Sequence, residues 1–186
     1  DFGKADERFQ AMLRRTDRTD AWLLAGAALP PLAKSDGMPL SRNEREAARR
    51  RAEMPAGFRH EMLSVALAAS AARFELSSDV RDLALHLIAA HHGHARPFAP
   101  VVVDESPPDV EYEGTSWSSN DPHIRPPHQI DSGIAERFWM LTRRFGWWGL
   151  AYLEAVLRLA DQQASAAEDA GAFDDANLVE TAEVTA

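Results

Sequence analysis

The segment 83–93, LALHLIAAHHG, constrains the fold of this chain more than any other stretch. Its apolar residues, together with one just before it, recur at helical spacing and form a single stripe: Val80, Leu83, Ala84, Leu87 and Ile88. Residues 77–79 (SSD) offer helix N-caps, and Gly93 is a natural stop at the other end. The pattern predicts a buried helix over 79–92.

Two histidines end this predicted helix. His91 occupies the next position of the apolar stripe and is expected to point inward, whereas His92 is turned by roughly 100° around the axis. A core-facing imidazole needs a partner for each ring nitrogen, either a hydrogen bond or a metal ion. Two histidines without further candidate ligands are more often structural than metal-binding. Whether these two bind a metal therefore depends on which other candidate ligands the chain contains.

Helical patterns account for most of the remaining sequence and predict an all-α fold. The other expected helices cover residues 1–15, 41–54, 58–73, 131–145 and 147–167. Between them, the proline-rich segment 94–127 predicts a long loop, with one short strand at Val101–Val103 as an open alternative. We expect one domain over 1–170 and an acidic tail over 171–186.

Composition narrows the possible functions. The 186 residues carry a formal net charge of −9, which argues against a broad duplex-DNA surface but not against a local basic groove. The chain has no cysteine, which excludes disulfides and thiolate metal sites and fits a cytoplasmic protein. No apolar run reaches transmembrane length, so no membrane partner is expected. The one basic cluster lies in the predicted helix 41–54, where a solvated face and a phosphate-contacting face are equally good interpretations.

Three further polar residues join the histidine pair on predicted inward positions. His60 lies in the predicted helix 58–73, Asp161 continues a row of leucines in the last helix, and Asp1 opens the first helix. Each alone is more readily explained as structural. Together with His91 and His92 they form a set of imidazoles and carboxylates suited to one or two divalent transition ions. We therefore expect these side chains to converge.

Several short motifs resemble, in order and rough spacing, the HD nuclease domain of the CRISPR-associated type I helicase-nuclease. Asp1-Phe2-Gly3-Lys4 is similar to the end of the H-D-x-G-K motif of the HD superfamily of metal-dependent phosphohydrolases. The other matching phrases are Phe58-Arg59-His60-Glu61, Ala90-His91-His92-Gly93 and Leu159-Ala160-Asp161. The resemblance covers most of the chain, and its strength lies in the ordered set.

The resemblance implies an HD-like helical bundle around two metal ions, drawn from Mn, Ni, Co, Fe or Mg. Asp1 would bridge the ions, His60, His91 and His92 would bind one, and Asp161 would help to complete the other. Lys4 would contact a phosphate or steady the carboxylate of Asp1, which makes Asp1 and Lys4 the implied catalytic residues. The motif also has a histidine directly before the aspartate and another further upstream, so a chain that starts at Asp1 is expected to be a fragment with an incomplete ligand set.

The implied activity is metal-dependent hydrolysis of single-stranded DNA in antiviral defence, with a helicase and a CRISPR effector complex as partners. Substrate contacts are expected from Lys4, Arg59 and Arg96. Further candidates are basic or aromatic residues that could line a groove: Arg143, Arg144, Trp117, Trp147 and Trp148. For the Trp147–Trp148 pair, core packing is the favoured interpretation. Two alternatives remain, namely an HD phosphohydrolase acting on nucleotides or cyclic nucleotides, and a non-catalytic helical interaction module.

Overall fold

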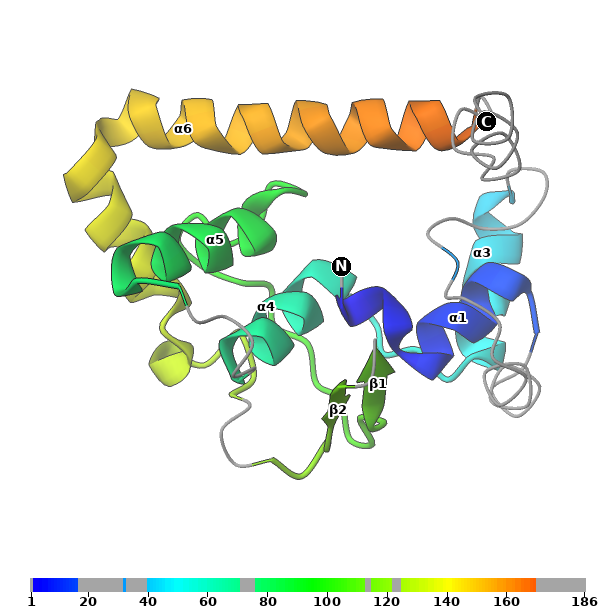
Figure 1. Ribbon diagram of the computed structural model, residues 1–186. Coiled ribbons are helices and arrows are strands. Elements are labelled where there is room, and N and C mark those ends of the chain that lie inside the picture. Colours follow the sequence, from blue (N-terminus) through cyan, green and yellow to red (C-terminus); the bar gives the residue numbers. More distant parts are fainter. Residues whose placement is uncertain are drawn as a thin grey trace, which may run out of the picture.

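The protein is mostly helical, which confirms the expected class at that level. The computed structural model describes residues 2–16, 32, 40–70, 76–112, 115–121 and 125–169. Its helical elements are η1 (Phe2–Ala5), α1 (Glu7–Arg14), α3 (Arg42–Arg51), α4 (His60–Ser70), α5 (Ser78–Ala90), η2 (Ile130–Ser132) and α6 (Ile134–Asp169), as shown in Figure 1. The expected acidic tail, 171–186, lies outside the described residues.

Helix α4 lies at the centre of the bundle, in contact with both η1 and α5. It is rich in alanine and small residues, so that neighbouring backbones can approach it closely. Gly3 in η1 shows how close this approach is, because a Cβ atom at Gly3 would lie 2.0 Å from the carbonyl oxygen of His60. The amide of Gly3 also donates a hydrogen bond of 2.8 Å to the hydroxyl of Ser64. The N-terminal turn is therefore fixed against the start of α4.

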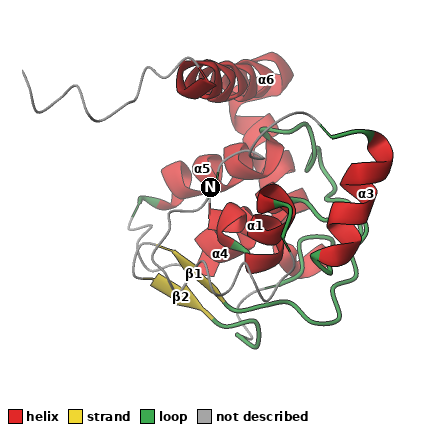
Figure 2. Cartoon of the chain, turned by 90° about the vertical axis from the view of Figure 1, so that its right-hand side faces the viewer, coloured by secondary structure: helices red, strands yellow, loops and turns green. Residues whose placement is uncertain are grey.

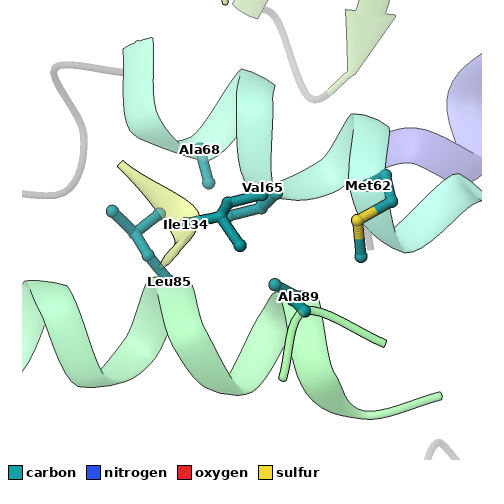
Figure 3. Packing of buried hydrophobic residues seen from close by; sticks show 7 residues of the cluster. Met62, Val65, Ala68, Leu85, Ala89 and Ile134 are labelled. Carbon is teal, nitrogen blue, oxygen red and sulfur yellow. The ribbon is translucent and has the colours of Figure 1, made fainter. Parts of the chain in front are cut away.

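The main hydrophobic core lies between α4 and α5. Figure 3 shows side chains of α4 facing those of α5, with Ile134 from the start of α6 inserted between them. The buried residues of this core are Met62, Val65, Ala68, Leu85, Ala89, Ala95 and Ile134. Burial of apolar surface contributes about 25 cal/mol of free energy for each Å² removed from water. This burial therefore determines how the two helices pack.

The buried face of α5 differs from the predicted one. Leu85, His86, Ala89 and Ala90 are buried, whereas Val80 is 52 % exposed and the rest of the predicted stripe is half-buried. The prediction was wrong because it assumed that α5 has one covered side. In fact α4 covers one side of α5 and α6 covers another, so the buried surface is broader and rotated.

Helix α6 consists of two helical segments that meet at Gly146, the residue at which the sequence predicted a break between two helices. Gly146 has φ 70° and ψ 167°, a conformation that is essentially restricted to glycine. The part of α6 after this break runs across the top of Figure 1. Trp147 is 61 % exposed and Trp148 is 89 % exposed, so core packing is the wrong interpretation for this pair. Among the helices of the described ranges, none has both the length and the apolar content needed to cross a membrane.

The proline-rich excursion contains a small hairpin that the sequence did not indicate. Strands β1 (Val110–Tyr112) and β2 (Thr115–Trp117) pair antiparallel, on the side of the molecule away from α6 in Figure 2. Residues 101–103, for which a short strand was an open alternative, have no regular structure. Trp117 is only 5 % exposed, and its indole N–H donates to the carbonyl oxygen of Leu67 at 3.1 Å. Its burial removes Trp117 from the candidates for base stacking.

Polar interactions stabilise α1 and α3. Arg8 is buried and pairs with Asp6 at 2.9 Å and with Asp104 at 2.7 Å, which ties the excursion to α1. Ser41 and Glu44 form the predicted capping box at the start of α3. Helix α3 packs on α1, on the opposite side of the molecule from α5 in Figure 1.

Candidate metal centre

Three histidines from two different helices meet at one place. His60 is the first residue of α4, and His91 and His92 directly follow the last residue of α5. The chain can turn away immediately afterwards because Gly93 adopts φ 88°. The ring centroids of His60 and His91 are 5.9 Å apart, and those of His60 and His92 are 5.0 Å apart. The expected convergence of these three imidazoles is confirmed.

The spacing of the nitrogen atoms suits a metal ion. One ligand nitrogen from each histidine can be chosen so that all three lie within 4.8 Å of one another. The Nε2 atoms of His60 and His92 are 3.2 Å apart. Two nitrogens that each lie 2.0–2.1 Å from a tetrahedral zinc-type ion are separated by roughly 3.3 Å. The three imidazoles are therefore a group that could hold a borderline transition ion.

His91 has the environment of a metal ligand. Its Nδ1 lies 2.7 Å from the carbonyl oxygen of Ile88, a distance at which Nδ1–H donates to that oxygen. This hydrogen bond selects the tautomer that has its lone pair on Nε2. Metal-binding histidines usually make such a bond with the nitrogen that does not face the ion, because it fixes the ring and increases its basicity.

Burial keeps the three imidazoles neutral at pH 7. It lowers the pKa of His60 to about 4, with the negative charge of Glu61 opposing this effect and the positive charge of Lys4 adding to it. Burial is also the main cause of the lowered pKa of His91 and of His92. A neutral imidazole is the form that binds metal ions, so the cluster presents three ligands without first having to release protons.

The structure describes one of the two carboxylates that the resemblance assigns to the site. Asp161 is half-buried and does not belong to the three-histidine group, although its negative charge raises the pKa of all three histidines. Asp161 thus lies close enough to act on the cluster, and its role as a ligand stays a prediction. Asp1 lies outside the described residues, so its expected role as a bridging ligand also stays a prediction.

The expected substrate contacts lie in different settings. Lys4 is half-buried in η1, and its charge acts on His60. Arg59 is exposed, directly precedes His60, and lines a cavity of about 340 Å³. Arg96 pairs with the carboxylate of Glu154 and is still 43 % exposed. Of these three residues, Arg59 is the one that lies next to a histidine of the cluster and also lines the cavity.

The cavity beside Arg59 lies between α4 and the proline-rich excursion. Its walls are mainly apolar and include Met62, Leu63, Val102, Val110 and Trp117. Arg59, Asp104, Arg125 and His128 also line it. Apolar walls with a few charged groups are typical of sites for small organic ligands.

Two buried polar residues on the helices that carry the histidines, Glu61 in α4 and His86 in α5, were not predicted from the sequence. Glu61, which is 1 % exposed, directly follows His60. His86 is also 1 % exposed, and its Nε2 lies 2.6 Å from the Oε1 of Glu154 in α6. The available signal was the phrase 83–93 itself, in which His86 interrupts an otherwise apolar run. Glu154 interrupts a similar apolar run in α6, and two such polar residues need each other as partners.

Comparisons with known proteins found no relative. No protein-family model matches the chain, and no curated protein or solved structure matches it. The three converging histidines and the resemblance in sequence motifs are therefore the basis for assigning a function.

Proposed function

We propose that this chain binds divalent transition metal ions and hydrolyses phosphodiester bonds in single-stranded DNA. The convergence of His60, His91 and His92 is the observation that carries the proposal. The HD nuclease resemblance supplies the reaction class and the substrate. In this proposal a helicase and a CRISPR effector complex are the partners, and the protein acts in the cytoplasm.

The roles proposed for the three histidines rest on their positions, and those proposed for Asp1 and Asp161 rest on the resemblance in sequence motifs. The three neutral imidazoles hold one ion, and Asp161 with Asp1 contributes to a second. A pair of such ions supplies an activated water molecule and stabilises the leaving oxygen. Lys4 and Arg59 hold the phosphate groups of the strand beside the cluster. Their positive charges offset the electrostatic repulsion between the DNA and a chain of net charge −9.

The cavity beside Arg59 favours a second candidate function. Its volume of about 340 Å³ and its mainly apolar walls suit a nucleoside better than a continuous strand. An HD phosphohydrolase acting on nucleotides or cyclic nucleotides would place the base in this cavity and the phosphate near His60. Under this candidate, small nucleotides are hydrolysed and single-stranded DNA is not.

The exposed apolar side chains of α6 favour a third candidate, a non-catalytic interaction module. Trp148 is 89 % exposed, Tyr152 is 68 % exposed and Leu159 is 57 % exposed. Such side chains in a row on one helix are typical of surfaces that bind other proteins. A module of this kind would hydrolyse neither single-stranded DNA nor small nucleotides.

A cleavage assay with matched variants tests the proposal. We expect a protein that carries this chain together with the two upstream histidines of the motif, supplied with manganese or nickel, to degrade single-stranded DNA, and we expect His92→Ala in that protein to reduce the rate at least about 100-fold because one ligand is lost. Glu46→Ala is the control, since Glu46 is an exposed residue of α3, and it should retain the parent rate. Equal rates in the parent and His92→Ala would contradict the proposal, and hydrolysis of small nucleotides alone would favour the second candidate.

A further inference from the structure

Glu61 is a buried carboxylate for which the described residues offer no hydrogen-bond partner. Its side chain is 1 % exposed, and neither carboxylate oxygen accepts a hydrogen bond within the part of the chain that the structure describes. Removal of a carboxylate from water costs several kcal/mol when nothing compensates it. A residue that only had to fill this position in α4 would be better served by an apolar side chain.

The position of Glu61 relative to His60 suggests what compensates this cost. The Oε2 of Glu61 lies 3.6 Å from the Nδ1 of His60, while the Nε2 of the same ring faces the Nε2 of His92 at 3.2 Å. The imidazole of His60 thus has the carboxylate on one side and the histidine cluster on the other. A separation of 3.6 Å is longer than a hydrogen bond, so the carboxylate lies behind the ring without a hydrogen bond to it.

This arrangement is the one that metal sites use to orient a histidine. A ligating imidazole usually donates its second N–H to a carboxylate or a carbonyl oxygen. His91 already donates to the carbonyl of Ile88, and Glu61 stands in the corresponding place for His60. The negative charge of Glu61 also acts on all three histidines, since it raises the pKa of each.

Charge balance points in the same direction. Three neutral imidazoles leave the two positive charges of a divalent ion uncompensated in a half-buried site. A buried carboxylate nearby reduces that charge, and the ion in turn compensates the carboxylate. Burial of Glu61 is costly in the metal-free chain and becomes favourable when the ion is bound.

We propose that Glu61 is a positioning residue that accepts the Nδ1–H of His60 and balances the charge of a divalent cation held by His60, His91 and His92. This inference rests on the metal binding in the proposed function and adds a residue to it. Glu61 does not touch the ion, because it is not a member of the group of ligand atoms that lie within 4.8 Å of one another.

A purely structural role makes a different prediction. Glu61 lies in the first turn of α4, where a carboxylate interacts favourably with the helix dipole. If that were its purpose, neutralisation of the charge would destabilise the metal-free fold and would leave the metal affinity of the folded chain unchanged. The positioning role predicts the reverse for both quantities.

The test compares Glu61→Gln and Glu61→Leu with the parent and with Glu46→Gln, a control on the exposed surface of α3. Zinc and nickel affinities are measured by titration calorimetry, and the free energy of unfolding of the metal-free chains is measured with urea. We expect the affinity to fall about 10–100-fold in Glu61→Gln and further in Glu61→Leu, because the amide oxygen can still accept Nδ1–H but carries no charge. We expect the metal-free Glu61→Gln chain to be as stable as the parent or more stable.

Each remaining outcome is decisive. Affinities of both Glu61 variants within twofold of the parent would overturn the inference while leaving metal binding intact. Unfolding or clear destabilisation of metal-free Glu61→Gln would assign Glu61 to the fold and would also overturn it. Failure of the parent and of Glu46→Gln to bind either metal would instead remove the metal binding on which both proposals depend.

Discussion

At the scale of single residues, burial of ionisable groups is the main organising feature of this protein. His86 lies in the interface between α5 and α6, where its Nε2–H donates to Glu154 at 2.6 Å. Burial, followed by the positive charges of Arg96 and Arg137, lowers the pKa of His86 to about 4. The neutral ring therefore joins the two helices through a hydrogen bond, and Arg96 supplies the positive charge that Glu154 requires.

This burial makes the stability of the fold depend on pH. The pKa of His86 is about 4 in the folded chain and near 6.5 in the unfolded chain, so the unfolded chain takes up a proton first as the pH falls. The contribution of the neutral His86 side chain to the free energy of unfolding is complete above pH 6.5 and is lost as the pH falls from about 6.5 to 4. Between pH 7 and pH 5 the loss amounts to about 2 kcal/mol.

The variant His86→Gln isolates this effect, since its amide can donate to Glu154 but does not titrate. Urea unfolding at both pH values should show that the parent loses about 2 kcal/mol more than His86→Gln between pH 7 and pH 5. An equal loss in both chains would show that His86 is not the source of the pH dependence.

At the scale of helices and strands, local signals account for where most elements begin and end. The capping box of Ser41 and Glu44 and the breaks at Gly93 and Gly146 were all predictable from sequence, because caps and stops depend on a few neighbouring residues. The covered face of α5 and the strands at 110–117 were not predictable. Both depend on contacts with distant segments, such as the packing of Trp117 on Leu67.

Gly146 gives a direct test of how α6 is built. Its φ of 70° and ψ of 167° suit glycine alone, and an added Cβ would meet no atom within 4 Å. Gly146→Ala should therefore lower the free energy of unfolding by about 1–3 kcal/mol through backbone strain alone. Urea unfolding at neutral pH provides the measurement.

The same helix provides the matched control. Gly149 is helical, and an added Cβ would lie 3.4 Å from the Cβ of Phe145, an ordinary contact. Gly149→Ala should be neutral or should stabilise the chain by up to about 1 kcal/mol, because alanine favours a helix over glycine. Equal effects of the two substitutions would show that the break at Gly146 does not require a glycine.

At the scale of the whole molecule, the candidate site lies where the start of α4 meets the end of α5. The core between these helices, seen in Figure 3, fixes their relative position and therefore the distance from His60 to His91 and His92. The set of histidines was predictable because each belongs to a short motif. The carboxylate Glu61 was not, because its burial and its position behind His60 exist only in the folded chain.

All of the proposed chemistry requires that His60, His91 and His92 together hold a divalent ion. Calorimetric titration of the metal-free chain with zinc or nickel tests this binding directly. His92 is exposed, so His92→Ala should leave the thermal unfolding temperature nearly unchanged, and His128→Ala is a control histidine outside the group. We predict tight metal binding by the parent and by His128→Ala. The loss of metal affinity in His92→Ala should exceed the 10–100-fold loss that is typical when a hydrogen-bond partner of a metal ligand is removed. Equal affinity in His92→Ala and the parent, or no binding by the parent, would contradict the account.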